Sequence, residues 1–162
     1  MSTSASSPAL PSGYTLFRRI GSVKTEGSVH FTAFTQKGDL FQWTTHVTDI
    51  NTASATSGNY TLPSVPLGIA TIWQGYGTMF GASAGGNFQV TLFTPGTTGL
   101  SSGASMASFN PSGSIPGFCG GQFSVLTNTS QQISFVGTFS ASVTATTQLV
   151  TSGWIDRRGR DD

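Results

Sequence analysis

Apolar and polar residues alternate along several segments of this chain with the two-residue period of a β-strand. The alternation is clearest at residues 88–92 and 133–139, where every second side chain is Phe, Val, Leu or Ile, apart from Gly137. No segment shows the 3.6-residue apolar spacing of an amphipathic helix, and Gly, Ser and Thr are scattered throughout. The pattern therefore predicts an all-β protein with no helix longer than a short turn.

The first part of the chain predicts a β-hairpin. Residues 29–36 and 40–48 are rich in β-forming residues, and Lys37-Gly38-Asp39 between them provides a tight turn. A further strand is expected at residues 14–20, followed by a turn at Glu26-Gly27. Later strands are predicted near residues 66–73, 77–80, 87–93, 121–126, 131–139 and 148–155.

Two segments differ from the strands around them. Residues 51–59 read as a polar loop, and residues 94–121 read as a long loop containing Pro95, Pro111 and Pro116. About nine short strands with turns every 8–12 residues predict a single β-sandwich, of jelly-roll type, over residues 13–160. Residues 1–12 are rich in Ser, Ala and Pro and predict a flexible N-terminal arm.

Composition supports a folded domain in spite of a low charge. Only 8% of residues are charged, against an ordinary share of about 25%. Disordered chains lack aromatic residues, whereas this one has 12 Phe and is 36% hydrophobic. A net charge of +1 is too small for a nucleic-acid binder. No apolar run approaches the ~20 residues of a membrane span, so no membrane insertion is expected.

The charged residues are confined to the two ends of the chain. Between Asp49 and Asp156 there is no Asp, Glu, Lys, Arg or His. Acid–base catalysis and most metal sites need those side chains, so we expect a structural or recognition protein rather than an enzyme, with no cofactor and no metal. Such a neutral surface stays soluble either by burial in an oligomer or through a coat of hydroxyl and amide groups.

Few residues are candidates for chemistry. His30 and His46 would form a metal or acid–base pair if the hairpin placed them opposite one another, but two exposed polar residues are the simpler interpretation. Cys119 is either a nucleophile or a small buried apolar residue, and we favour burial. A glycan depolymerase would have to take its paired carboxylates from residues such as Glu26, Asp39 and Asp49.

Each end of the chain carries an arginine pair. Arg18 and Arg19 are near the start, and Arg157 and Arg158 follow Asp156 near the end. If the first and last strands are neighbours, these residues form one patch that docks to a partner or to another subunit through Arg–carboxylate pairs. The alternative is a solvated charged rim.

Aromatic residues in the neutral middle suggest a second kind of surface. A flat apolar ring among neutral hydrogen-bonding groups is the usual composition of a carbohydrate site. The candidates for glycan contact are Tyr60, Trp73, Tyr76 and Phe109. The alternative for each of them is a place in the core.

Two stretches carry a resemblance to known proteins. One is Ala9-Leu10-Pro11-Ser12-Gly13-Tyr14-Thr15-Leu16-Phe17-Arg18-Arg19-Ile20-Gly21-Ser22, with further similarity up to Gly27 and over residues 36–43. The other is Gly153-Trp154-Ile155-Asp156-Arg157-Arg158-Gly159-Arg160. Together they cover about the first quarter and the last tenth of the chain, and they resemble a family of tailed-bacteriophage and prophage virion proteins of the tail-fibre or spike type.

The resemblance implies a β-rich virion component, a homotrimer whose ends form a base against other virion proteins. The neutral middle would then face the bacterial surface and its glycans. No catalytic motif is implied. The expected location is the virion, assembled in the host cytoplasm, because residues 1–9 lack the pattern of a signal peptide. A capsid decoration or cement protein, bound to the major capsid protein through residues 1–11, is the alternative.

Overall fold

The computed structural model describes residues 9–16, 21–26, 30–53, 57–82, 88–97, 105–109, 117–139 and 144–157. Over these ranges the protein is all-β and contains no helix. The strands are β1 (Thr25–Glu26), β2 (His30–Phe31), β3 (Phe34–Lys37), β4 (Leu40–Ala53), β5 (Gly58–Thr61), β6 (Ile72–Ala82), β7 (Phe88–Phe93), β8 (Ser105–Phe109), β9 (Gly117–Leu126), β10 (Gln132–Phe139) and β11 (Thr144–Ile155).

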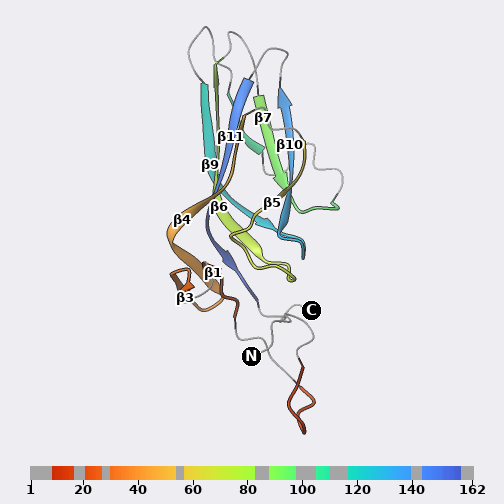
Figure 1. Ribbon diagram of the computed structural model, residues 1–162. Helices are drawn as coiled ribbons and strands as arrows, with labels where there is room; N and C mark the ends of the chain where they lie inside the picture. Colours follow the sequence, from red (N-terminus) through yellow and green to blue (C-terminus); the bar gives the residue numbers. More distant parts are fainter. Residues whose placement is uncertain are drawn as a thin grey trace.

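Two antiparallel sheets make up the body of the molecule (Figure 1). The larger has the order β3-β4-β11-β6-β9, and the smaller has the order β5-β10-β7-β8. Strands β1 and β2 form a small separate sheet. Side chains from the inner faces of the two larger sheets form one core, so the predicted all-β sandwich is confirmed.

A segment near the start of the chain and a segment near its C-terminus lie together at one end of the sandwich, here called the base end (Figure 1). The Ser22 hydroxyl donates to the Asp156 carboxylate at 3.4 Å, and the Asp156 backbone N–H donates to the Asp39 carbonyl at 2.9 Å. The predicted hairpin is also here: β3 and β4 pair with Lys37 opposite Leu40, and Gly38 has a φ of 61°.

Four predicted segments differ from the structure. The polar loop predicted at residues 51–59 is shorter, since residues 51–53 belong to β4 and residues 58–59 belong to β5. Residues 66–71 form a loop rather than a strand, because Pro66 and Gly68 (φ 86°) interrupt the extended chain. Residues 14–16 are not a strand either; the Tyr14 N–H donates to the Pro11 carbonyl in a turn. The long loop predicted at residues 94–121 contains β8 and the first part of β9.

Aromatic residues fill the base end of the core. The Phe41 and Trp154 rings stack with centroids 5.1 Å apart and an interplanar angle of 6°. The ring centroids of Trp43 and Trp154 lie 5.0 Å apart. Phe34, on β3, packs against this group, with its ring centroid 5.8 Å from that of Phe41. Gly153 allows this close packing, because a Cβ atom there would lie 2.9 Å from the Cα atom of Gln42.

Further along β6, Trp73 is completely buried. Its indole covers Gly75, where an added Cβ would lie 2.6 Å from a ring carbon. Gly75, Tyr76 and Gly77 all lie within β6, which pairs with β9 in an unbroken register. The register shift is in β11, between Thr151 and Gly153.

Candidate functional site

The outer face of the five-stranded sheet is the best candidate for a recognition surface. Along β6, Trp73, Gly75, Gly77 and Met79 are buried, so the residues between them point away from the core. Tyr76 is at the centre of this outward series and is 40% exposed. The register places Val150 on one side of Tyr76 and Gln122 on the other.

A second ring accompanies Tyr76. The centroid of the exposed His46 imidazole lies 5.8 Å from that of Tyr76, with the planes tilted by 33°. His46 belongs to an irregular part of β4, since the pairing with β11 shifts between Val47 and Gln42. The two rings, from β4 and β6, form an aromatic pair on the outer face.

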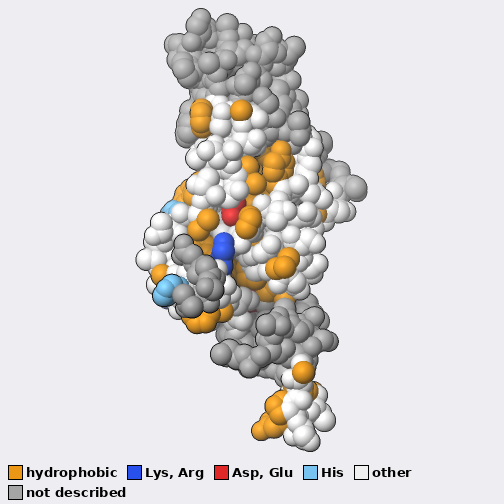
Figure 2. Space-filling view, in the orientation of Figure 1, with side chains coloured by type: hydrophobic (Ala, Val, Ile, Leu, Met, Phe, Trp, Pro, Cys, Tyr) orange, Lys and Arg blue, Asp and Glu red, His pale blue; other side chains and the backbone are white. Residues whose placement is uncertain are grey.

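Neutral hydrogen-bonding groups lie around the aromatic pair, together with the apolar Val150 and the exposed Phe80. On β6 and β9, the Gln74 amide donates to the Ser124 hydroxyl, and Gln122 is exposed beside Tyr76. Gln148 on β11 lies opposite Thr78. The space-filling view shows one side of the molecule, and on that side charged side chains are few while neutral surface dominates (Figure 2). We name this surface the Tyr76 face: Tyr76 and His46 with Gln74, Thr78, Gln122, Ser124 and Gln148.

The chemistry of the Tyr76 face suits a neutral polar ligand. Aromatic rings present apolar faces to C–H groups, and amides and hydroxyls both donate and accept hydrogen bonds. A flat sheet face cannot enclose a small molecule, but it can contact several units of an extended chain. These are the requirements of an oligosaccharide with many hydroxyl groups.

The other predicted glycan contacts lie elsewhere. Trp73 is 0% exposed and its indole N–H donates to the Thr151 hydroxyl at 2.6 Å, so its assignment to a ligand surface was wrong. Tyr60, on β5, is half-buried and packs edge-on against Phe135 with centroids 5.4 Å apart. The side chain of Phe109 lies outside the described residues, although its backbone is in β8.

The predicted docking patch is described only in part. Arg18, Arg19 and Arg158 lie outside the described residues. Asp156 is completely buried, so the prediction that its side chain contacts a partner was wrong; it accepts a hydrogen bond from Ser22 instead. Arg157 is exposed next to it. The hydrogen bond between Ser22 and Asp156 joins the described segments next to the two arginine pairs, and the single charged patch stays a prediction.

Asp49, which the sequence offered only as a possible catalytic carboxylate, has a structural role that the sequence did not indicate. Leu149 pairs with Ile50 and Val150 pairs with Thr48, which leaves Asp49 as the extra residue of a β-bulge. Its carboxylate accepts hydrogen bonds from the backbone N–H of Ser64, at 3.1 Å, and from the Ser64 hydroxyl.

The Asp49 carboxylate also accepts a hydrogen bond from the Thr151 hydroxyl at 2.5 Å. The oxygen of that hydroxyl accepts the Trp73 indole N–H in turn. Asp49 therefore ties the loop at Ser64 to the centre of the larger sheet. A carboxylate used in this way has a structural role. This role becomes visible only when the pairing of β4 with β11 shows that Asp49 lies in a bulge.

The histidines do not form the pair considered from the sequence. His30 pairs with Glu26 in the small sheet, whereas His46 lies beside Tyr76. Across the described ranges, no group of three or more His, Cys, Asp or Glu side chains is close enough to hold a metal ion. The side chain of Cys119 lies outside the described residues. None of the described residues forms a helix long and apolar enough to cross a membrane.

No protein-family model, curated protein or solved structure matches this chain. Its function is therefore inferred from the geometry of the chain and from the resemblance at its ends.

Proposed function

We propose that this protein is a non-enzymatic structural component of a bacteriophage virion, a homotrimeric fibre or spike protein that attaches to host-surface glycans through the Tyr76 face. The exposed Tyr76–His46 ring pair among neutral amides and hydroxyls is the observation that supports attachment. Weak contacts are sufficient, because many copies on one particle multiply modest affinities. The segments that resemble virion proteins lie partly at the base end, and Gly153 among them pairs with Gln74 at the edge of the Tyr76 face.

The strand order supports a jelly-roll sandwich. Strands β4-β11-β6-β9 in one sheet face β5-β10-β7-β8 in the other. From β4 to β11 the chain changes sheet at each connection except that between β7 and β8. Eight strands divided equally between two sheets, with these crossovers, are the arrangement of a double Greek key. This architecture is common in capsid proteins and lectins, and both classes agree with the proposal.

The way in which Asp49 and Asp156 are used supports a non-enzymatic role. Asp49 accepts hydrogen bonds from Ser64 and Thr151, and Asp156 is completely buried. Carboxylates engaged in this way hold the fold together and are poorly placed to attack or protonate a glycosidic bond. Sugar release from a host polysaccharide by the purified protein would contradict this part of the proposal.

A capsid decoration protein is the second candidate, and the segment Ala9–Leu16 favours it. Tyr14 is 68% exposed and Leu16 is 86% exposed, and the segment extends away from the sandwich at the base end (Figure 1). A segment that projects from the body with exposed apolar side chains is suited to pack against a neighbouring protein. In this alternative the neighbour is the major capsid protein, and the Tyr76 face binds no glycan.

Glycan binding tests the proposal directly. Purified protein, coupled to beads to make it multivalent, is applied to an array of bacterial lipopolysaccharides and capsular polysaccharides. We expect binding that falls at least tenfold in Tyr76→Ala and in His46→Ala. The matched control is Val136→Ala, which removes a side chain of similar exposure from β10 on the other sheet. Binding that is unchanged in Tyr76→Ala, or no binding to any polysaccharide, would contradict attachment through this face.

A further inference from the structure

The outer face of the five-stranded sheet carries another exposed aromatic ring besides the Tyr76–His46 pair. Phe80 lies four residues after Tyr76 on β6, and because side chains alternate along a strand, both point to the same face. Phe80 is 46% exposed, which is more than Tyr76. Four residues of a strand span about 13 Å, so the two rings occupy separate positions along one strand.

The surface between the two rings is polar and neutral. Thr78 lies midway between them on β6, Gln148 lies opposite Thr78 on β11, and Asn51 lies opposite Gln148 on β4. These three side chains are half-buried or exposed, and each can both donate and accept hydrogen bonds. Along β6 the face therefore presents a ring, then amide and hydroxyl groups, then a second ring.

The surface in the opposite direction, toward the base end, has a different composition. The outward residue four positions before Tyr76 is Ile72, which pairs with Ile155 on β11 and with Leu126 on β9, while Leu40 on β4 pairs with Ile155. The neighbours of these residues along each strand belong to the core, so the four aliphatic side chains point outward. They form one row across the sheet that offers no hydrogen-bonding side chain.

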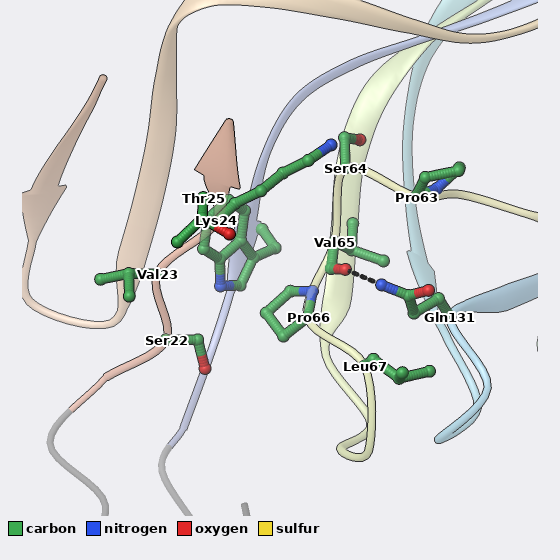
Figure 3. Close-up of a pocket in the computed structure, with 11 residues that line it drawn as sticks. Ser22, Val23, Lys24, Thr25, Pro63, Ser64, Val65, Pro66, Leu67 and Gln131 are labelled. Atoms are coloured by element: carbon green, nitrogen blue, oxygen red, sulfur yellow. Dashed lines mark hydrogen bonds between the residues drawn. The ribbon is translucent and has the colours of Figure 1, made fainter. Parts of the chain in front are cut away.

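Lysine side chains accompany this aliphatic row. Lys37 on β3 pairs with Leu40 at the end of the row. Lys24 lines a cleft between residues 22–25 and 63–67, and Figure 3 shows its side chain extended with the amino group toward Ser64. Aliphatic side chains leave sugar hydroxyls without partners, and ammonium groups favour anionic ligands. The base end is therefore less suited to a neutral glycan than the surface between Tyr76 and Phe80.

We infer that the glycan chain runs along β6 from Tyr76 toward Phe80, whose ring stacks on a sugar unit further along the chain. The inference rests on the proposed function and deepens it, because it names a second binding position and the direction of the ligand. A short fragment occupies only the Tyr76–His46 pair, whereas a longer fragment reaches both rings. Two linked contacts bind more tightly than one, because formation of the second is intramolecular.

Fragments of different lengths test the inference. The probe is the polysaccharide with the strongest signal on the array, cut by partial acid hydrolysis and separated by size. Titrations followed by NMR give the dissociation constant of each fragment for the protein in solution, where no beads add multivalency. We expect this constant to fall at least tenfold once the fragments are long enough to span the about 13 Å between the two positions.

Substitutions assign this gain to one end of the face. Phe80→Ala is expected to remove the gain for long fragments and to leave the affinity for the shortest fragments unchanged. Phe80→Tyr keeps a flat ring and should retain the gain. The matched control is Leu126→Ala, since Leu126 is 45% exposed on the same face but belongs to the aliphatic row, and this variant should behave as the parent. Circular dichroism first confirms that each variant is folded.

The outcomes separate the inference from the proposed function. A dissociation constant that does not change with length, a Phe80→Ala variant that keeps the gain, or a Leu126→Ala variant that loses it would each overturn the inference. Glycan attachment through the Tyr76 face still stands in those cases if Tyr76→Ala weakens the binding of every fragment. Binding of no fragment at all, or equal binding by Tyr76→Ala and the parent, would overturn both proposals together.

Discussion

The Thr151 hydroxyl is predicted to be one of the most important polar groups for stability. It accepts the Trp73 indole N–H at 2.6 Å and donates to the Asp49 carboxylate at 2.5 Å. Thr151 and Trp73 are both 0% exposed, so water cannot replace either partner. Thr151→Val keeps the shape of the side chain and removes both hydrogen bonds.

The expected cost follows from these contacts. Leaving the buried Trp73 N–H without an acceptor costs about 1–3 kcal/mol, and a hydrogen bond to a charged acceptor contributes about 1.5–3 kcal/mol. The two terms are coupled through one hydroxyl, so we expect a total loss of about 2–4 kcal/mol in the free energy of unfolding. In a protein of this size that corresponds to a fall in Tm of about 5–15 °C.

Thr147→Val is the matched control, on the same strand. Thr147 is 1% exposed, but its hydroxyl has no hydrogen-bond partner. Removing an unsatisfied buried hydroxyl should leave stability unchanged or raise it by about 1–2 kcal/mol. Urea unfolding followed by tryptophan fluorescence, at fixed protein concentration, measures both variants. A Thr151→Val variant as stable as Thr147→Val would refute the role assigned to the Asp49 bulge.

Two further substitutions test the packing. Gly153→Ala places a Cβ atom 2.9 Å from the Cα of Gln42, so we expect a loss of about 2–4 kcal/mol by thermal unfolding. Gly58→Ala, with open space around the new atom, should change stability by less than about 1 kcal/mol, and equal losses would contradict the packing. Phe41→Ala removes the ring stacked on Trp154 and should lower the free energy of unfolding by about 3–5 kcal/mol. The control is Phe80→Ala, where the side chain is 46% exposed and the loss should be less than about 1 kcal/mol. Similar losses for the two variants in chemical denaturation would argue against the aromatic cluster.

The hydrophobic pattern predicted the fold class because the two-residue alternation of a β-strand can be recognised from neighbouring residues alone. The alternation at residues 88–92 and 133–139 lies in β7 and β10, and the turn at Gly38 joins β3 to β4 as expected. Local patterns do not reveal which strand pairs with which, however. The position of β11 between β4 and β6 depends on contacts between residues far apart in the sequence.

The candidate site could be predicted only in part, for the same reason. Trp73 and Tyr76 look equally suitable in composition, yet they point to opposite faces of β6, as their odd separation of three residues requires. Once one of these two residues is known to be buried, the odd separation indicates that the other points away from the core. No local signal places His46 beside Tyr76, because the contact comes from an irregular part of β4.

The measurement that tests the central claim most directly is a cryo-EM map of the phage particles in which we expect this chain. The account predicts trimers that project from the tail or the head, with the base end toward the particle and the Tyr76 face exposed outward. A flat layer that bridges capsomers through residues 9–16 and covers the Tyr76 face would contradict attachment and favour the decoration protein. Virions without density for this chain would contradict the structural role itself.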